Sequence, residues 1–200
     1  YNLFESMNDK GLGLSQTDLI KNYIFMKISE SISDHTKEEQ TRELNELTDT
    51  WGEILGDVKL AKYNFDTFLM YYWDANYSQI RKHQVYQSFK TGAYSAEKVK
   101  SEIAKLLESS RALHMIIRPT TYDQDDWEAQ SSAEYREICE VLTDINSFGI
   151  KQFHILLLKL VAFFGIDEDI PIKMASSPGP FDDYDDIARE LFGKGYKDLT

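Results

Sequence analysis

SQTDLIKNYIFMKISESI, residues 15–32, joins a helix-start signal to apolar residues at helical spacing. Asp18 follows Ser15 by three residues, which is a variant of the capping box that opens many helices. The apolar positions then recur every three or four residues, as one face of a helix requires. They are Leu19, Ile20, Tyr23, Ile24, Ile28 and Ile32. The stretch therefore predicts an amphipathic helix that begins at Ser15.

The same periodicity recurs along the rest of the chain and predicts a fold built from helices. Ser95 is the expected N-cap of one helix, and Gly56, Gly92 and Gly149 are the expected ends of three others. Alternating β-branched runs are few, and no Asn-Gly hairpin signal occurs. We therefore predict a mostly all-α, multi-helix, bundle-like domain. Its apolar faces are Leu44, Leu47, Trp51, Ile54, Leu55; Phe65, Phe68, Leu69, Tyr72; Val85, Tyr86, Phe89; Val99, Ile103, Leu106, Leu107; Tyr135, Ile138, Leu142, Ile145; Phe153, Leu156, Leu157, Leu160, Val161, Phe164; and Ile187, Leu191, Phe192.

The composition narrows the classes of partner. The 200 residues include 22 basic and 34 acidic side chains, which give a formal charge of −12. This charge argues against wholesale binding to nucleic acid or acidic membranes. It does not exclude a local basic patch. The most apolar stretch, residues 153–166, is too short to span a bilayer and contains Lys159. A single cysteine, Cys139, excludes an internal disulfide framework. We expect a cytoplasmic protein with no membrane partner.

The segment FESMNDKGLGLSQTDLIKN, residues 4–22, has the chemistry of half a phosphate site. Gly11 permits close approach of the backbone, Lys10 supplies positive charge, and the helix that starts near Ser15 directs its N-terminal dipole toward the segment. Asn8 can orient a ligand as both donor and acceptor. Asp18 can hold Lys21 or a metal. The alternative is a glycine turn into a capped helix, in which Asp18 serves only the cap.

This segment resembles a signature of the GmrS-type family of modification-dependent restriction proteins. The family's Phe-x-x-x-Asn-x-x-Gly motif matches at Phe4, Asn8 and Gly11, and its Asp-Leu-Ile-Lys-Asn run matches residues 18–22, including Lys21 and Asn22. Lys10 stands where the family usually has arginine, which keeps the charge but not the planar bidentate donor. The family's Asp-Gly-Gln-Gln-Arg and His-Asn-His-like nuclease motifs do not occur in this chain. Residues 71–90 are also similar to the family's helical middle part, more loosely.

The resemblance implies a central fragment of a nucleotide-dependent restriction protein that acts on modified phage DNA. Residues 1–35 would be the C-terminal end of a truncated α+β nucleotide-binding domain, and residues 36–200 a helical domain. The cofactor of the full-length protein would be a nucleoside triphosphate with Mg²⁺, and its partners would be DNA and a nuclease domain in the same chain or another subunit. The nucleotide-binding residues would be Phe4, Asn8, Lys10, Gly11, Asp18, Lys21 and Asn22. The chain starts at Tyr1, which we interpret as a piece of a larger protein.

A second candidate surface is the basic stretch at residues 79–100. Its candidates for DNA contact are Arg81, Lys82 and Lys90, with aromatic residues between them and Glu97 as the single acid of the stretch. Basic side chains along a helix can meet a DNA backbone. The alternative is a solvated helix face whose aromatic residues lie in the core.

Two other classes remain open from the sequence. One is a non-enzymatic helical interaction or scaffold module. The other is an Asp-rich isoprenoid enzyme, for which the acidic clusters at residues 182–186 and 123–128 would have to line a deep apolar cavity. No metal site is expected from the histidines, because His35, His83, His114 and His154 lack metal-ligand spacing.

Overall fold

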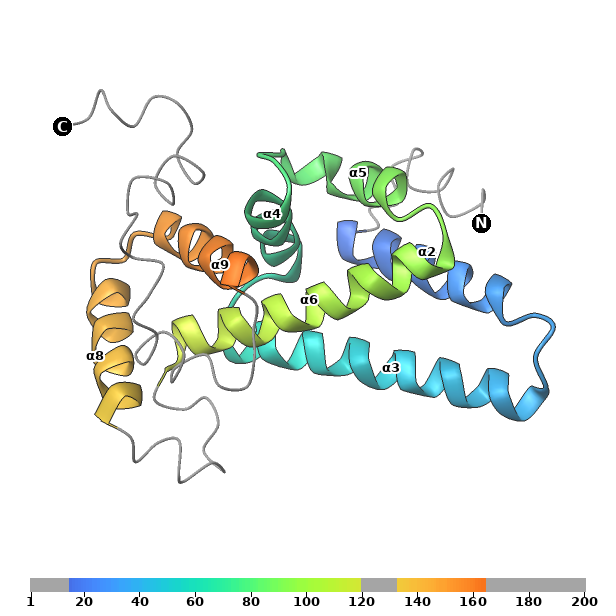
Figure 1. Ribbon diagram of the computed structural model, residues 1–200. Helices are drawn as coiled ribbons and strands as arrows, with labels where there is room; N and C mark the ends of the chain where they lie inside the picture. The colour runs from blue at the N-terminus through green and yellow to red at the C-terminus, as the bar shows by residue number, and fades with distance from the viewer. Residues whose placement is uncertain (1–14, 120–132, 165–200) are drawn as a thin grey trace.

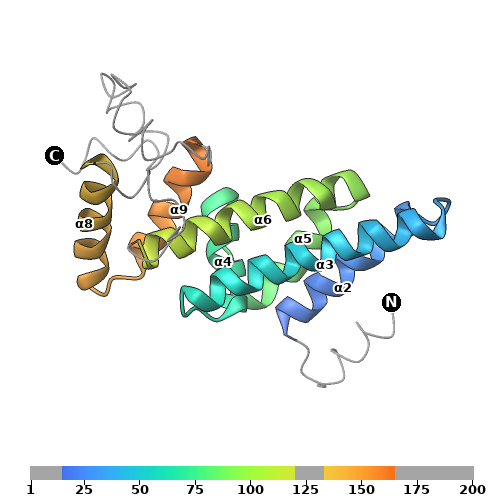
Figure 2. The ribbon, with the colours of Figure 1, turned by 90° about the horizontal axis from the view of Figure 1, so that it is seen from below.

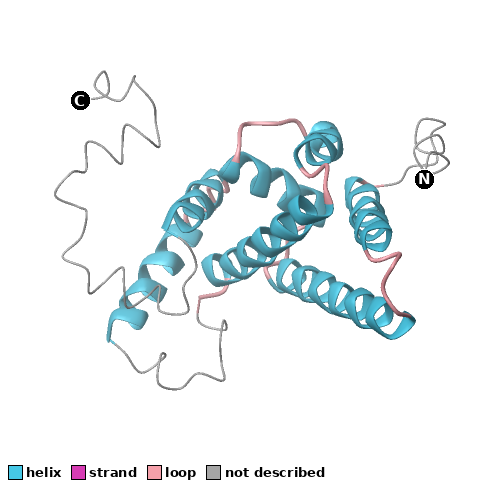
Figure 3. Ribbon diagram, turned by 45° about the vertical axis from the view of Figure 1, so that its right-hand side comes forward, coloured by secondary structure: helices cyan, strands magenta, loops and turns pink. Residues whose placement is uncertain are grey.

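The computed structural model describes residues 15–119 and 133–164 (Figure 1). This part of the chain is 82% helical, with seven α-helices and no strand, as the colouring by secondary structure shows (Figure 3). The predicted all-α class is confirmed. The elements are α2 (Gln16–Ser31), α3 (Lys37–Leu60), α4 (Phe65–Asn76), the 3₁₀ turn η1 (Lys82–Gln84), α5 (Val85–Gly92), α6 (Ala96–Ile117), α8 (Ala133–Ser147) and α9 (Gln152–Phe164).

Helix starts follow the predicted capping chemistry. The Ser15 hydroxyl oxygen accepts from the Asp18 N–H at 3.1 Å, and the Asp18 carboxylate accepts from the Ser15 N–H at 3.2 Å, which completes the capping box of α2. Ser95 caps α6 as expected. Thr36 and Glu39 form a second capping box, which starts α3 within the acidic run at residues 34–47.

The helix ends agree less well with the glycine signals. α5 ends at Gly92, and Gly149 follows α8 with a positive φ of +67°, which suits glycine. Gly56 does not end α3, because that helix continues to Leu60. The reason is packing: Val58, one turn from Ile54, is 1% exposed, so burial of the apolar face extends the helix past the glycine.

Packing organises the helices around two long neighbours. α3 and α6 lie side by side, and α2 packs on α5, α6 and α3 (Figures 1 and 2). The buried residues of α2 join one core with those of the later helices. Residues 1–14 lie outside the described part, so the division at residue 35 stays a prediction.

The face of α9 differs from the predicted one. α9 packs on α4 and α6. Leu158 is 2% exposed and His154 is also buried, whereas Phe153, predicted to be buried, is 36% exposed. Leu157 is half-buried against the core. The run is apolar at most of its positions, so periodicity alone does not determine which side of the helix faces the core.

Candidate functional site

Four of the predicted nucleotide-binding residues, Phe4, Asn8, Lys10 and Gly11, lie outside the described residues. The other three occupy the first two turns of α2. The side chain of Asp18 serves the cap, where it accepts from the Ser15 hydroxyl at 2.7 Å. Lys21 is exposed and holds its Nζ 5.7 Å from the centre of the Phe25 ring. Asn22 is half-buried.

The first turn of α2 is tied to the body of the protein. Thr17 donates its N–H and its hydroxyl to Asp66 Oδ1, at 3.0 Å and 2.6 Å. Asp66 lies in the first turn of α4 and is mostly buried, and its other oxygen lies 3.5 Å from Lys82 Nζ. Gln16 Oε1 accepts from the N–H of Tyr86 in α5 at 3.0 Å. The first turn of α2, which belongs to the segment at residues 4–22, is therefore held by α4 and α5.

In the folded protein, acidic side chains lie beside some of the basic residues at positions 79–100. Lys82 pairs with Asp66, and Lys90 Nζ lies 6.0 Å from the centre of the Tyr86 ring. Lys100, from the same stretch, pairs with Glu43 of α3 at 3.1 Å. Arg81 precedes η1 and is exposed. Acidic residues of other helices thus offset part of the charge that the sequence concentrates here.

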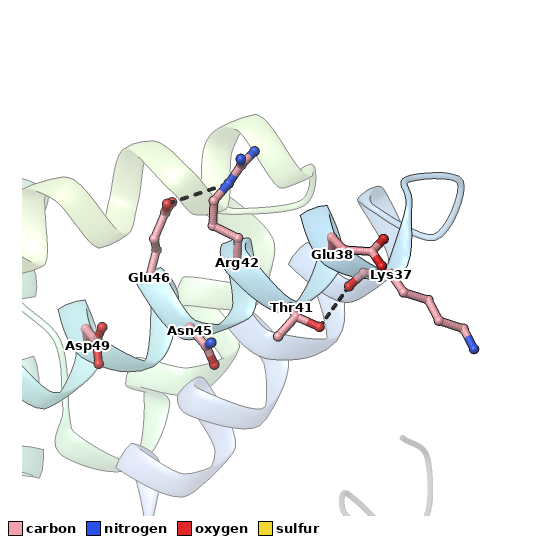
Figure 4. A pocket seen from close by; sticks show the side chains of 7 residues that line it. All are labelled: Lys37, Glu38, Thr41, Arg42, Asn45, Glu46 and Asp49. Carbon is pink, nitrogen blue, oxygen red and sulfur yellow. Dashed lines mark hydrogen bonds and ion pairs between the residues drawn. The ribbon is translucent and has the colours of Figure 1, made fainter.

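The outer face of α3 forms a shallow hollow (Figure 4). All of its lining residues are exposed and belong to this one helix, and they carry both signs of charge. Arg42 Nε lies 4.0 Å from Glu46, and the Thr41 hydroxyl donates to the Lys37 carbonyl at 2.8 Å. A mixed, solvent-facing helix surface of this kind is ordinary and assigns no ligand. The lining residues are Lys37, Glu38, Thr41, Arg42, Asn45, Glu46 and Asp49.

A serine, a histidine and an aspartate meet between α3 and α6 without forming a nucleophilic site. The buried Ser110 hydroxyl lies 2.9 Å from Asp57 Oδ2, and His114 Nδ1 lies 3.4 Å from Asp57 Oδ1. A nucleophilic serine needs its hydroxyl on the imidazole that takes the proton. Here the carboxylate holds both side chains instead, so the cluster joins the two helices.

A metal site is likewise absent from the described ranges, where no group of three or more His, Cys, Asp or Glu side chains is placed to hold an ion. Cys139 is buried, and burial raises the pKa of its thiol. A raised pKa disfavours the thiolate, which is the reactive form. The acidic clusters at residues 182–186 and 123–128 lie outside the described residues.

The sequence did not single out Glu102, a buried acid of α6. Its carboxylate accepts from the hydroxyl of Tyr72 at 2.6 Å and from that of Tyr77, and Lys105 Nζ lies 3.2 Å away. Burial is the main cause that raises the pKa of both tyrosines, followed by the charge of Glu102 at Tyr72 and by the hydrogen bond to Glu102 at Tyr77, so both remain neutral donors. The sequence nevertheless contains a signal for this buried acid, because Glu102 interrupts the apolar face of Val99, Ile103 and Leu106.

No family model matches the chain, and neither does any curated protein or solved structure. In residues 15–119 and 133–164, none of the helices combines the length and the apolar character needed to cross a membrane.

Proposed function

We propose that the chain is the central part of a bacterial, cytoplasmic, GmrS-like restriction protein that uses a nucleoside triphosphate with Mg²⁺ to act on modified phage DNA. The support from sequence is the similarity at Phe4, Asn8, Gly11 and residues 18–22. In this proposal Asn8 and Gly11 contact the nucleotide or shape its pocket. Asp18, Lys21 and Asn22 set the helix start beside it. A nuclease domain in the same chain or a partner subunit cuts the DNA.

One observation from the fold carries the proposal: the anchoring of the first turn of α2. Thr17 bonds to Asp66 through both its N–H and its hydroxyl, and Gln16 bonds to the start of α5. A displacement of the motif segment would therefore move α4 and α5 directly. The helices are suited to pass a nucleotide-dependent change from the motif to the rest of the protein.

The nucleotide role is tested with Asn8→Ala in the full-length protein. We expect this change to abolish nucleoside triphosphate hydrolysis in a phosphate-release assay and to leave the fold and melting temperature unchanged. Hydrolysis at the wild-type rate would contradict the assignment of Asn8.

The coupling role is tested with Thr17→Val in the full-length protein. This change removes the hydroxyl that donates to Asp66 while it keeps the backbone bond and the side-chain shape. We expect hydrolysis to continue and cleavage of modified DNA to fall. Thr48→Val is the matched control, because the Thr48 hydroxyl bonds only within α3, to the Leu44 carbonyl at 2.7 Å. Equal loss of both activities, or no loss of either, would argue against coupling through this contact.

A non-enzymatic interaction module is the second candidate, and exposed apolar residues favour it. Val141 in α8, and Phe148 and Ile150 in the turn after that helix, are 53%, 69% and 44% exposed. Large apolar side chains exposed close together are typical of interaction sites, and Phe148 and Ile150 are two positions apart in the chain. In this case Asn8→Ala would change neither hydrolysis nor cleavage, whereas charged substitutions at Phe148 would abolish partner binding.

A further inference from the structure

Helix α8 carries two apolar faces, and only one of them is buried. Tyr135, Cys139 and Leu142 form the buried face, at a spacing of four and three residues. The helix packs on α6 at one end of the described helices (Figures 1 and 2). A surface helix of a globular domain normally shows a single apolar stripe, which faces the core. Packing within the described residues therefore does not account for the second face.

The second face is a regular row, called the outer row below. It consists of Ile138, Val141, Ile145 and Phe148, spaced three, four and three residues apart. The two isoleucines are half-buried, whereas Val141 is 53% and Phe148 is 69% exposed. Phe148 directly follows the helix and continues the row, because its N–H donates to the Ile145 carbonyl at 3.3 Å. This spacing is the a/d pattern of a helix that pairs with another helix.

Two acidic residues border the outer row on the side away from the buried face. Glu137 comes one turn before Val141, and Asp144 comes one turn before Phe148. Both acids are exposed, and neither forms an ion pair with another described residue. In the a/d pattern they occupy the same flanking position of two successive heptads, and charges at flanking positions determine which helix is accepted as a partner.

The charge of this border favours a basic partner over a second copy of the chain. Each copy has a formal charge of −12. In an antiparallel pair of α8 helices, Glu137 and Asp144 would face the same two acids of the other copy, and like charges across an interface oppose association. A helix with Lys or Arg beside its own apolar residues would instead form ion pairs with both acids.

We propose that the outer row of α8 docks an amphipathic helix of a partner protein, with Lys or Arg residues of that helix beside Glu137 and Asp144. This proposal rests on the interaction-module candidate described above, and it adds the shape and the charge of the partner. It involves neither the motif segment nor a nucleotide. The mode of binding is the packing of apolar anchors at helical spacing, as in other complexes that recognise a helix.

Three synthetic peptides of about three heptads test the proposal on the 200-residue chain by fluorescence anisotropy. The Lys peptide has Leu at the a and d positions and Lys at the flanking positions. The Glu peptide has Glu in place of those lysines, and the Lys–Ser peptide keeps the lysines but has Ser at a and d. We expect the Lys peptide to bind with a Kd of about 100 μM or tighter. The other two should bind at least about tenfold more weakly, because each lacks one half of the complementarity.

Phe148→Ser tests the apolar part of the surface without a change of charge. We expect it to weaken binding of the Lys peptide at least about fivefold, since large aromatic residues contribute much of the energy of an interface. Tyr94→Ser is the matched control, because Tyr94 is 68% exposed and lies between α5 and α6. Melting curves of both variants show whether the fold is kept.

The double change Glu137→Lys and Asp144→Lys tests the charge. It should weaken binding of the Lys peptide at least about fivefold and strengthen binding of the Glu peptide, because two attractions become repulsions. The control is Asp49→Lys with Glu108→Lys, which changes the net charge equally at exposed positions of α3 and α6. This control should keep the preference for the Lys peptide.

The outcomes separate the partner from the surface. Equal binding of the Lys and Glu peptides that Phe148→Ser weakens would overturn the basic partner and leave the interaction module standing. Binding of neither peptide, or binding that Phe148→Ser leaves unchanged, would show that the outer row is not a docking surface. Sedimentation of the wild type would overturn the proposal in another way, if it showed a dimer that Phe148→Ser abolishes, because the occupant would then be a second copy.

Discussion

At the scale of single residues, His154 links three parts of the fold through its two ring nitrogens. Nδ1 shares a hydrogen bond with the Tyr63 hydroxyl, and Nε2 lies 3.0 Å from Asn146 Oδ1 in α8. Burial raises the pKa of Tyr63 to about 12, so the tyrosine keeps its proton near neutral pH. Asn146 Nδ2 donates to the Ile116 carbonyl, so Asn146 Oδ1 is the acceptor that faces Nε2. Nε2 therefore carries the imidazole proton, and Nδ1 accepts from the Tyr63 hydroxyl. The network requires a neutral histidine.

This requirement predicts a pH-dependent stability. Burial, followed by the charge of Lys151, lowers the pKa of His154 below its ordinary 6.5. The unfolded chain therefore binds a proton at a higher pH than the folded one, and the contribution of His154 is complete above about pH 6.5 and is lost as the pH falls below it. We expect the free energy of unfolding, measured by urea titration, to be lower at pH of about 5.5 than at about 7.5.

His154→Gln separates this group from the others that titrate. The variant should be less stable than the wild type at the higher pH and should lose less stability on acidification. His83→Gln is the control, because His83 is exposed in η1. If His154→Gln kept the full wild-type decrease, the pH dependence would arise elsewhere.

At the scale of elements, the sequence indicates where helices begin better than where they end. Ser15 and Ser95 start α2 and α6 because their side chains satisfy backbone N–H groups locally, and a local signal is readable from the sequence. Gly56 fails as a stop signal, since the burial of Val58 depends on helices distant in sequence. Tertiary packing overrides a weak propensity such as that of glycine.

The register of α9 yields a prediction at this scale. Leu158 is 2% exposed and packs in the core, whereas Phe153 on the same helix is 36% exposed. Leu158→Ala should lower the free energy of unfolding by about 2–5 kcal/mol, because it leaves a cavity in close-packed surroundings. Phe153→Ala should lower it by much less, although it removes more atoms. Urea titration of both variants checks this, and a larger effect at Phe153 would show that the predicted face was the right one.

The candidate sites show the same division between local and distant signals. The cap role of Asp18 was readable from the sequence, whereas the bond between Thr17 and Asp66 joins residues 49 positions apart and carries no sequence signal. The cluster around Glu102 escaped notice for the same reason. Tyr72 lies in α4 and Glu102 in α6, and only the interrupted apolar face at Glu102 pointed to the cluster.

At the scale of the whole molecule, the chain is strongly negative, and its candidate DNA surface lies at η1 and α5, which follow α4. Arg81 and Lys82 flank the start of η1, and Lys90 lies in the last turn of α5. Lys82 is partly committed to Asp66, which also holds the start of α2. DNA bound here would compete with Asp66 for Lys82. It would thereby affect the residue that holds Thr17 at the start of α2.

If these three residues contact phosphates in the full-length protein, their replacement by alanine should weaken DNA binding and change its dependence on salt. Each lost phosphate contact lowers the slope of log K against log salt concentration by about 0.9 for duplex DNA, so the triple variant should lose between about 1 and 3 units of slope. The matched control replaces Lys37, Arg42 and Lys59 of α3, which changes the net charge equally at another place. Fluorescence anisotropy across a salt series measures the affinity and the salt slope of both triple variants. Equal changes in the two variants would reflect overall charge alone, and an unchanged slope in the first would make this a solvated surface.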